Sequence, residues 1–136
     1  MAKIGLEDII QITVMDFCRY HKLDKFIFHV ANERTTSPQS GALLKRKGVL
    51  SGVSDILIMK PSNNYHGATI ELKSKNGKVS ANQQAFMDIL AEHGYFVAVC
   101  YSSDEAIAAI CEYLNIPHPH KPLPSPESQQ DFLGEF

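Results

Sequence analysis

The sequence has no long apolar run, few cysteines and no strong excess of either charge. No apolar stretch approaches the ~20 residues that span a bilayer, and the N-terminal residues lack the basic-then-apolar pattern of a secretion signal. The three cysteines, Cys18, Cys100 and Cys111, are odd in number, form no C-x-x-C pair and each lie in an apolar run. We therefore expect free, buried thiols in a soluble protein of the reducing cytoplasm.

Histidines at metal-ligand spacing are also lacking. His118 and His120 flank Pro119, and His66 lies in a predicted turn, but no second pair accompanies them at a spacing typical of zinc sites. We expect none of the six histidines to be a metal ligand.

The small net charge, −2, hides an uneven distribution of charge along the chain. Such a balance argues against a protein that coats nucleic acid through bulk electrostatics. From residue 34 to residue 78, however, eight basic residues outnumber two acidic ones, a local charge of +6 that leaves −8 on the remainder. This window predicts one anion-binding face, although a solvated lysine-rich loop would carry the same charges. The candidate contacts are Arg34, Lys45, Arg46, Lys47, Lys75 and Lys78.

Apolar periodicity predicts a helix and then a short strand in the first third of the chain. The amphipathic helix, over about residues 6–20, is indicated by a mainly apolar set that recurs at helical spacing, namely Leu6, Ile9, Ile10, Thr13, Val14 and Phe17. Residues 26–30 predict an apolar strand. Residues 32–50 predict a polar and basic loop with a short helical piece near residues 42–46.

The rest of the domain alternates between strands and capped helices. Two apolar runs, residues 53–60 and 68–74, predict a strand pair joined by a turn rich in asparagine, proline and glycine. Ser80 predicts the start of a helix that reaches residue 93 and buries Phe86, Ile89 and Leu90. Residues 95–101 are apolar without alternation, which predicts a central strand covered on both faces. A capping box predicts the last helix, with residues Ser102, Glu105, Ile107, Ile110, Cys111 and Leu114 as its cap and buried stripe.

The order of these elements predicts one α/β domain, residues 1–115, with a central sheet flanked by helices. Five of the seven prolines lie between residues 117 and 126. We therefore expect residues 116–136 to form a flexible, proline-rich C-terminal tail.

The predicted strand pair carries charged residues where a core would be apolar. Because side chains alternate along a strand, Glu71 and Lys73 share one face while Ile70 and Leu72 point to the other. If the two strands pair through the turn, Asp55 lies close to Glu71 or Lys73. Two carboxylates and an amine would then converge.

Two nearby carboxylates repel each other, which raises a pKa unless a cation lies between them. Asp55, Glu71 and the strand carbonyl of Leu72 would supply the oxygen ligands that Mg²⁺ prefers, with sites left for water and phosphate. Lys73 could orient the attacking water or neutralise charge on the phosphate. This pattern suggests phosphodiester hydrolysis by a metal-activated water, but a solvated strand face with a surface Glu/Lys pair would show the same alternation.

Three stretches together resemble one nuclease family. GVLSGVSDILI, IELKSKNGKVSANQQAF and GYFVAVCYSSDEAIAAICEYL are similar to the virus-type replication-repair nuclease (VRR-NUC) domain, a branch of the PD-(D/E)xK superfamily. The resemblance covers residues 5–115 and implies a restriction-endonuclease-like α-β-β-β-α-β core. It also implies a Mg²⁺- or Mn²⁺-dependent DNA endonuclease that, like compact viral members, acts as a homodimer on branched DNA such as four-way junctions. It further suggests a phage-encoded protein acting in the host cytoplasm.

The resemblance assigns roles to individual residues of this sequence. The family's G-x-x-D aspartate, its E-x-K pair, its glutamine and its first-helix glutamate correspond to Asp55, Glu71, Lys73, Gln83 and Glu7. Ser54 stands where many members have proline, but that position is not a ligand. The basic residues named above would contact DNA.

Several of these positions also have local explanations. Ser80 and Gln83 fit an S-x-x-Q capping box, which needs no substrate, yet a helix N-terminus also attracts phosphate. Glu7 could simply favour the helix dipole. The segment HVANER resembles the family's segment after its first strand, so Asn32 or Glu33 would approach the site, unless they only form a turn.

The last residues, QDFLGEF, place Gln130, Leu133 and Phe136 at the spacing Q-x-x-L-x-x-F. This resembles the peptide by which replication and repair enzymes dock on sliding clamps, and a proline-rich tether suits its capture. The same spacing with valine at residues 11, 14 and 17 has a packing explanation, so the pattern is loose. A pull-down with the clamp, comparing the full chain with one ending at residue 126, separates docking from a frayed terminus.

Two rival functions remain from the sequence. One is a non-catalytic nucleic-acid-binding module on a nuclease fold, and the other is a nuclease acting on unbranched DNA or RNA. The intact set of Asp55, Glu71 and Lys73 speaks against the first, because a scaffold gains nothing from acids beside a phosphate that it must attract.

Overall fold

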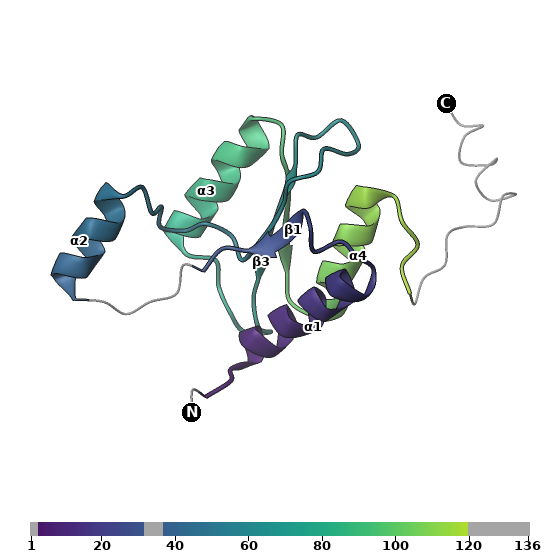
Figure 1. Ribbon diagram of the computed structural model, residues 1–136, viewed down its shortest axis with the longest axis horizontal. Helices are drawn as coiled ribbons and strands as arrows, with labels where there is room; N and C mark the ends of the chain where they lie inside the picture. The colour runs from purple at the N-terminus through teal and green to yellow at the C-terminus, as the bar shows by residue number, and fades with distance from the viewer. Residues whose placement is uncertain (1–2, 32–36, 120–136) are drawn as a thin grey trace, which may run out of the picture.

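The computed structural model describes residues 3–31 and 37–119, which form a four-stranded sheet with helices on both faces (Figure 1). The strands β1 (Ile27–His29), β2 (Ile56–Ile58), β3 (Ala68–Leu72) and β4 (Phe96–Cys100) lie in the order β1-β2-β3-β4. β2 is antiparallel to both β1 and β3, whereas β3 and β4 are parallel. This mixed sheet is the α/β architecture that the sequence predicts.

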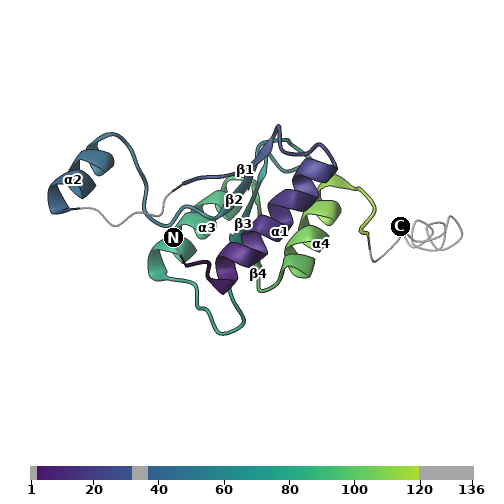
Figure 2. The ribbon, with the colours of Figure 1, turned by 60° about the horizontal axis from the view of Figure 1, so that its bottom comes forward.

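Four helices accompany the sheet: α1 (Leu6–Tyr20), α2 (Pro38–Arg46), α3 (Ala81–Glu92) and α4 (Ser103–Leu114). Figure 2 shows α1 and α4 side by side on one face, while α3 packs on the other face near β4. α2 is longer than the helical piece predicted near residues 42–46. None of the helices in the described ranges is long and apolar enough to cross a membrane.

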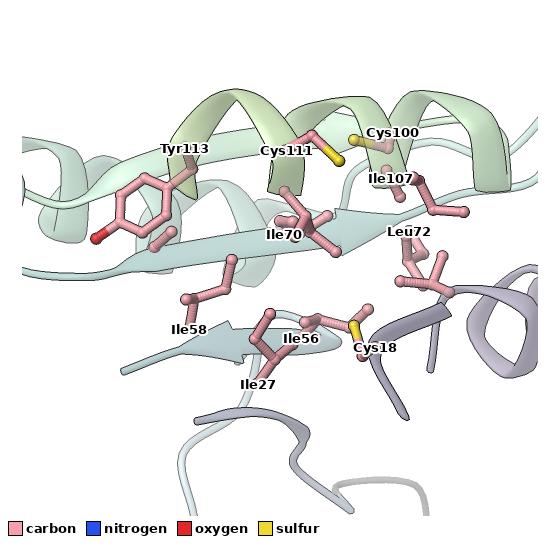
Figure 3. Close-up of a cluster of buried hydrophobic side chains, with 14 residues drawn as sticks. Cys18, Ile27, Ile56, Ile58, Ile70, Leu72, Cys100, Ile107, Cys111 and Tyr113 are labelled. Atoms are coloured by element: carbon pink, nitrogen blue, oxygen red, sulfur yellow. The ribbon is translucent and has the colours of Figure 1, made fainter. Parts of the chain in front are cut away.

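The core lies between the sheet and the layer formed by α1 and α4 (Figure 3). β-branched side chains suit the covered, pleated surface of a strand, and each fully buried one contributes about 1.5–3 kcal/mol. The cysteines Cys18, Cys100 and Cys111 are free and buried, as predicted. The largest apolar side chains of the core that are almost completely buried are Val14, Ile27, Ile56, Ile58, Ile70, Leu72, Ile110 and Tyr113.

Two helices bury a different stripe from the one predicted. Leu6 and Ile9 are 71% and 51% exposed, and Thr13 is also exposed. At 3.6 residues per turn, Leu6, Ile9 and Thr13 lie about a third of a turn round α1 from its buried residues Val14 and Cys18, so α1 turns a different side to the core. On α3, Met87 is buried and Ile89 is exposed, because this helix contacts the sheet mainly at β4.

The strand predicted to be central is an edge strand. β4 closes the sheet on one side, and the central strand β3 is buried at all five residues. β4 lacks alternation because α3 and α4 cover its two faces. The apolar run over residues 95–101 therefore indicated that helices cover both faces of the strand. It did not indicate where the strand lies in the sheet.

Two boundaries also differ from those predicted. The strand expected over residues 53–60 is reduced to Ile56–Ile58, because its ladder with β3 ends at the Ile56–Ile70 pair. At the other end of the domain, Ile116 packs against the core, one residue beyond the expected boundary. Of the predicted tail, the structure describes residues 116–119.

The turn between β2 and β3 is tied to the end of α4. Asn63 Nδ2 donates to the carbonyls of Glu112 and Tyr113, at 3.1 Å each, and Asn63 Oδ1 accepts from Asn115 Nδ2 at 2.8 Å. The Tyr113 hydroxyl donates to the Lys60 carbonyl at 2.6 Å. The Asn63 bonds satisfy helix-end carbonyls that have no partner within the helix.

Candidate active site

Strand register places three charged side chains on one face of the sheet. Leu57 of β2 pairs with Thr69 of β3, on the face away from α1 and α4. Asp55 lies two residues before Leu57, and Glu71 lies two residues after Thr69, so alternation puts both carboxyl groups on that face. Lys73 follows two residues later. The sheet therefore brings Asp55, Glu71 and Lys73 together, as the alternation predicted.

Asp55 occupies the place where the strand ladder stops. Its Oδ2 accepts the backbone N–H of Leu72 at 2.7 Å, where a further strand residue would otherwise pair. The N–H and C=O of a strand residue point to the same side, so the Leu72 carbonyl also faces the Asp55 side of β3. Burial raises the pKa of Asp55, while the Leu72 N–H bond and hydrogen bonding with Glu71 act against that rise.

Glu71 carries a carboxyl group but is only 2% exposed. Its Oε1 accepts a hydrogen bond from Gln83 Nε2 at 2.9 Å and lies 3.7 Å from Lys73 Nζ. Its Oε2 is buried and has no donor within the described ranges. Burial, the charge of Asp55 and hydrogen bonding with Asp55 raise the pKa of Glu71 to about 8, while the charge of Lys73 acts in the opposite direction.

Two acids and one lysine leave excess negative charge in a buried place. A proton or a cation would relieve it, because an uncompensated buried carboxylate costs several kcal/mol. The oxygens of Asp55, Glu71 and the Leu72 carbonyl are ligands of the kind that Mg²⁺ and Mn²⁺ prefer. Across the described residues, no group of three or more His, Cys, Asp or Glu side chains could hold a metal. Two carboxylates and one carbonyl, as oxygen donors, fit an ion that keeps several waters better than they fit zinc.

Gln83 combines the two roles that the sequence left open. Its backbone N–H donates to Ser80 Oγ at 3.2 Å, and its side-chain Oε1 accepts the Ser80 N–H at 2.8 Å, so the two residues form the capping box of α3. The other end of the amide, Nε2, donates to Glu71. Because the capping box holds the amide, the start of the helix orients the donor that holds Glu71.

Glu7 reaches the edge of this site from the first turn of α1. Its Oε1 accepts the backbone N–H of Ser74 at 3.3 Å, directly after Lys73. Beyond the effect of burial, the charge of Glu7 adds to the rise in the pKa of both Asp55 and Glu71. Its contact is thus with the backbone, and its influence on the two acids is electrostatic.

Part of the predicted basic face lies on α2. Lys45 and Arg46 form the last turn of this helix, and Lys47 is its C-cap. α2 buries none of its side chains and lies apart from the sheet in Figures 1 and 2. These three basic side chains therefore lie on a helix that projects from the sheet, and we call α2 with Lys47 the projecting arm.

The loop from β3 to α3 carries the other described candidates. Lys75 and Lys78 are both exposed in this loop, which connects Lys73 to the helix of Gln83. The basic residues are therefore divided between two parts of the chain, and the loop pair is nearer the acids in sequence. The remaining predicted contacts lie outside the described residues: Asn32, Glu33, Arg34, Gln130, Leu133 and Phe136.

His29, at the end of β1, was missed by the sequence analysis. Its Nδ1 lies 2.6 Å from the carbonyl oxygen of Asp55, so the Nδ1–H donates to the segment that carries this acid. The charge of His29 lowers the pKa of Asp55, against the larger rise that burial causes. Its position at the start of the HVANER segment was the available signal.

Comparison with known proteins identifies the same architecture. A family model described as the VRR-NUC domain matches residues 11–104. A solved structure titled "VRR_NUC domain protein" is 30% identical, and the alignment covers 85% of this chain and 93% of that chain with a TM-score of 0.71. No curated protein matches the sequence. The range matched by the family model includes Asp55, Glu71, Lys73 and Gln83, and begins after Glu7.

Proposed function

Because this chain belongs to the VRR-NUC domain family, whose fold is that of nucleases, we propose that it is a divalent-metal-dependent endonuclease that cuts branched DNA. The observation that carries the proposal is Glu71 Oε2, a buried carboxyl oxygen beside Asp55 with no donor in the described part of the chain. Such an oxygen takes up a proton near neutral pH or binds a cation. A paired set of acids that binds a cation next to a lysine is suited to phosphodiester hydrolysis.

Each residue of the site has a distinct part in the proposed reaction. Asp55, Glu71 and the Leu72 carbonyl would hold Mg²⁺ or Mn²⁺, which when bound lowers the pKa of a water and offsets charge on the phosphate. Gln83 holds Glu71 Oε1 in place. The ammonium of Lys73 would stabilise the negative charge that builds on the phosphate oxygens in the transition state.

The proposed branched substrate and the proposed dimer are linked by symmetry. A four-way junction has two-fold symmetry, so two copies of the chain could place one site on each of two opposing strands. Leu50 and Ile89 are 59% and 56% exposed and line one hollow between the loop before β2 and α3. Exposed apolar side chains in such a cluster support contact with a second copy.

Two other functions would use the same fold. A non-catalytic module would bind DNA through the basic residues without cutting it, and a nuclease for unbranched DNA or RNA would use the same acids on another substrate. The acid pair speaks against the module, because acids weaken phosphate binding unless a cation neutralises them. A comparison of substrates distinguishes the other nuclease.

The test incubates the purified chain with four-way, flap, single-stranded and duplex DNA and with RNA, in Mg²⁺ or Mn²⁺ and in chelator. We expect cleavage of the branched substrates that the chelator stops and that Asp55→Asn abolishes. Asp88→Asn, which changes an exposed acid of α3, is the control and should leave cleavage intact. Binding without cleavage would support the module, and cleavage in chelator would exclude the proposed mechanism.

A further inference from the structure

Gly52, three residues before Asp55, lies directly against the first turn of α3. A Cβ at Gly52 would lie 2.4 Å from the Asn82 carbonyl oxygen, 2.5 Å from the Asn82 carbonyl carbon and 2.9 Å from the Gln83 nitrogen. Ordinary contacts begin near 3.4 Å, so any side chain would force the two segments apart by about 1 Å. Next to this contact, Ser51 Oγ accepts a hydrogen bond from Asn82 Nδ2 at 3.1 Å.

This contact joins the two segments that build the acid pair. One segment continues into Asp55, and the other is the start of α3, from which Gln83 reaches Glu71. We propose that Gly52 is a positioning residue, whose missing side chain lets α3 approach closely enough for Gln83 to hold Glu71 beside Asp55. The inference rests on the proposed nuclease function and adds a residue to its site.

The close approach can be separated from the backbone conformation of this glycine. Gly52 has φ +89°, and Gly48 in the same connection has φ +99°, so an alanine at either position enters a conformation that L-residues rarely adopt. A Cβ at Gly48, however, would have no atom within 4 Å among the described residues. Gly48→Ala is therefore the matched control, with similar backbone strain and no contact with α3.

The activity test compares both variants on branched DNA. Gly52→Ala should lower kcat by about 100-fold with little change in KM, since a 1 Å displacement of a positioning element can cost that much. Gly48→Ala should stay close to the wild type. Gln83→Ala should lose a similar amount, and adding Gly52→Ala to it should cost little more, because both changes remove the same contact. Losses that multiply in the double variant would overturn the proposal.

A second readout needs neither metal nor DNA. In the ¹⁵N-labelled, metal-free protein, the Gln83 side-chain amide, assigned by its loss in Gln83→Ala, should be protected from solvent exchange. Gly52→Ala should move this signal toward that of a solvated glutamine, whereas Gly48→Ala should leave it in place. An unmoved signal in Gly52→Ala would contradict the inference. This arm holds even if the chain cuts no DNA, so it separates failure of the inference from failure of the proposed function.

Ser51→Ala covers the case in which Gly52→Ala does not fold. It removes the Ser51–Asn82 bond without adding an atom to the contact. The Gln83 signal should then move in the same direction by a smaller amount, with a loss in kcat of about 2- to 10-fold, as for one hydrogen bond. An unchanged signal and unchanged kcat in Ser51→Ala would count against a positioning role for this contact.

Discussion

The ammonium of Lys73 lies 3.7 Å from Glu71 Oε1, and the two side chains are only 11% and 2% exposed. An ion pair this deep differs from one at the surface, because removing either partner leaves the other charge uncompensated in a place that water hardly reaches. The pair is also lopsided, since Asp55 adds a second negative charge to the one that Lys73 offsets. One more cation would therefore offset the remaining negative charge of the site.

Removal of the Lys73 charge should reduce the chemical step more than DNA binding. Lys73→Met keeps a long side chain without its ammonium, and we expect kcat on branched DNA to fall by about 10²–10³-fold, as for loss of a group that stabilises transition-state charge. KM should change little. Lys75→Met, an exposed neighbour, should keep kcat near that of the wild type. Full activity in Lys73→Met with an intact circular dichroism spectrum would remove the lysine from the mechanism.

The stability of the metal-free protein should fall as the pH rises. The pKa of Glu71 is about 8 in the fold and 4.5 by its ordinary value, so between these values the folded state keeps a proton that the unfolded chain has released. The stabilisation is complete below about pH 4.5 and is lost as the pH rises to about 8, a change on the order of 2–4 kcal/mol. Burial raises the pKa of Asp55 as well and acts in the same direction. Urea denaturation in chelator across this range measures the slope.

Two variants and one ion control this measurement. Glu71→Gln should flatten the slope, because the amide does not titrate, whereas Glu92→Gln, at an exposed acid of α3, should retain it. Mg²⁺ at pH 8 should restore stability to the wild type and much less to Glu71→Gln, since a bound cation stabilises the folded state. A slope that survives Glu71→Gln would mean that another group dominates.

We expect the turn between β2 and β3, at the end of β3 away from the acids, to affect stability and not catalysis. Asn63→Ala removes its bonds to two helix-end carbonyls and to Asn115, and we expect unfolding to become easier by about 1–3 kcal/mol. Asn64→Ala is the control. Asn63 and Asn64 have positive φ values of 51° and 67°, so an alanine should introduce similar backbone strain at either position. The difference between the two variants in denaturant melts isolates the hydrogen bonds. Equal losses would assign the effect to the backbone alone.

The two basic groups should affect DNA affinity rather than the turnover of bound DNA. Lys75→Glu with Lys78→Glu should weaken binding to every DNA structure alike and reduce the slope of log K against log salt by about one per lost phosphate contact. Changing Lys45 and Arg46 on α2 in the same way tests the projecting arm. Lys60→Glu, an exposed lysine at the opposite end of the sheet, is the control. Unchanged salt slopes in both double variants would place the DNA contacts elsewhere.

Local signals predicted the elements and the acids well. The helix caps at Ser80 and Ser102 could be predicted from the sequence, because each serine accepts a hydrogen bond from the backbone N–H of the residue three positions later in the chain. Alternation along each strand, together with pairing of the two strands through their turn, placed Asp55, Glu71 and Lys73 on a common face, because side-chain direction in a strand has a fixed period of two. Such features depend on residues that are close together in the sequence.

Contacts between residues far apart in the sequence could not be predicted from such local patterns. Leu6 and Ile9 fit a buried stripe but lie on another side of α1 than the buried Val14 and Cys18, and residues 95–101 fit a central strand but lie at an edge under two helices. The contacts of His29 with Asp55 and of Gly52 with Asn82 join residues about 25–30 positions apart, and no spacing rule connects them. The sequence by itself thus determined the helices and strands and the side chains available for a site. Tertiary packing decided which of those side chains are buried and which contact one another, because both depend on where whole elements end and how closely they approach.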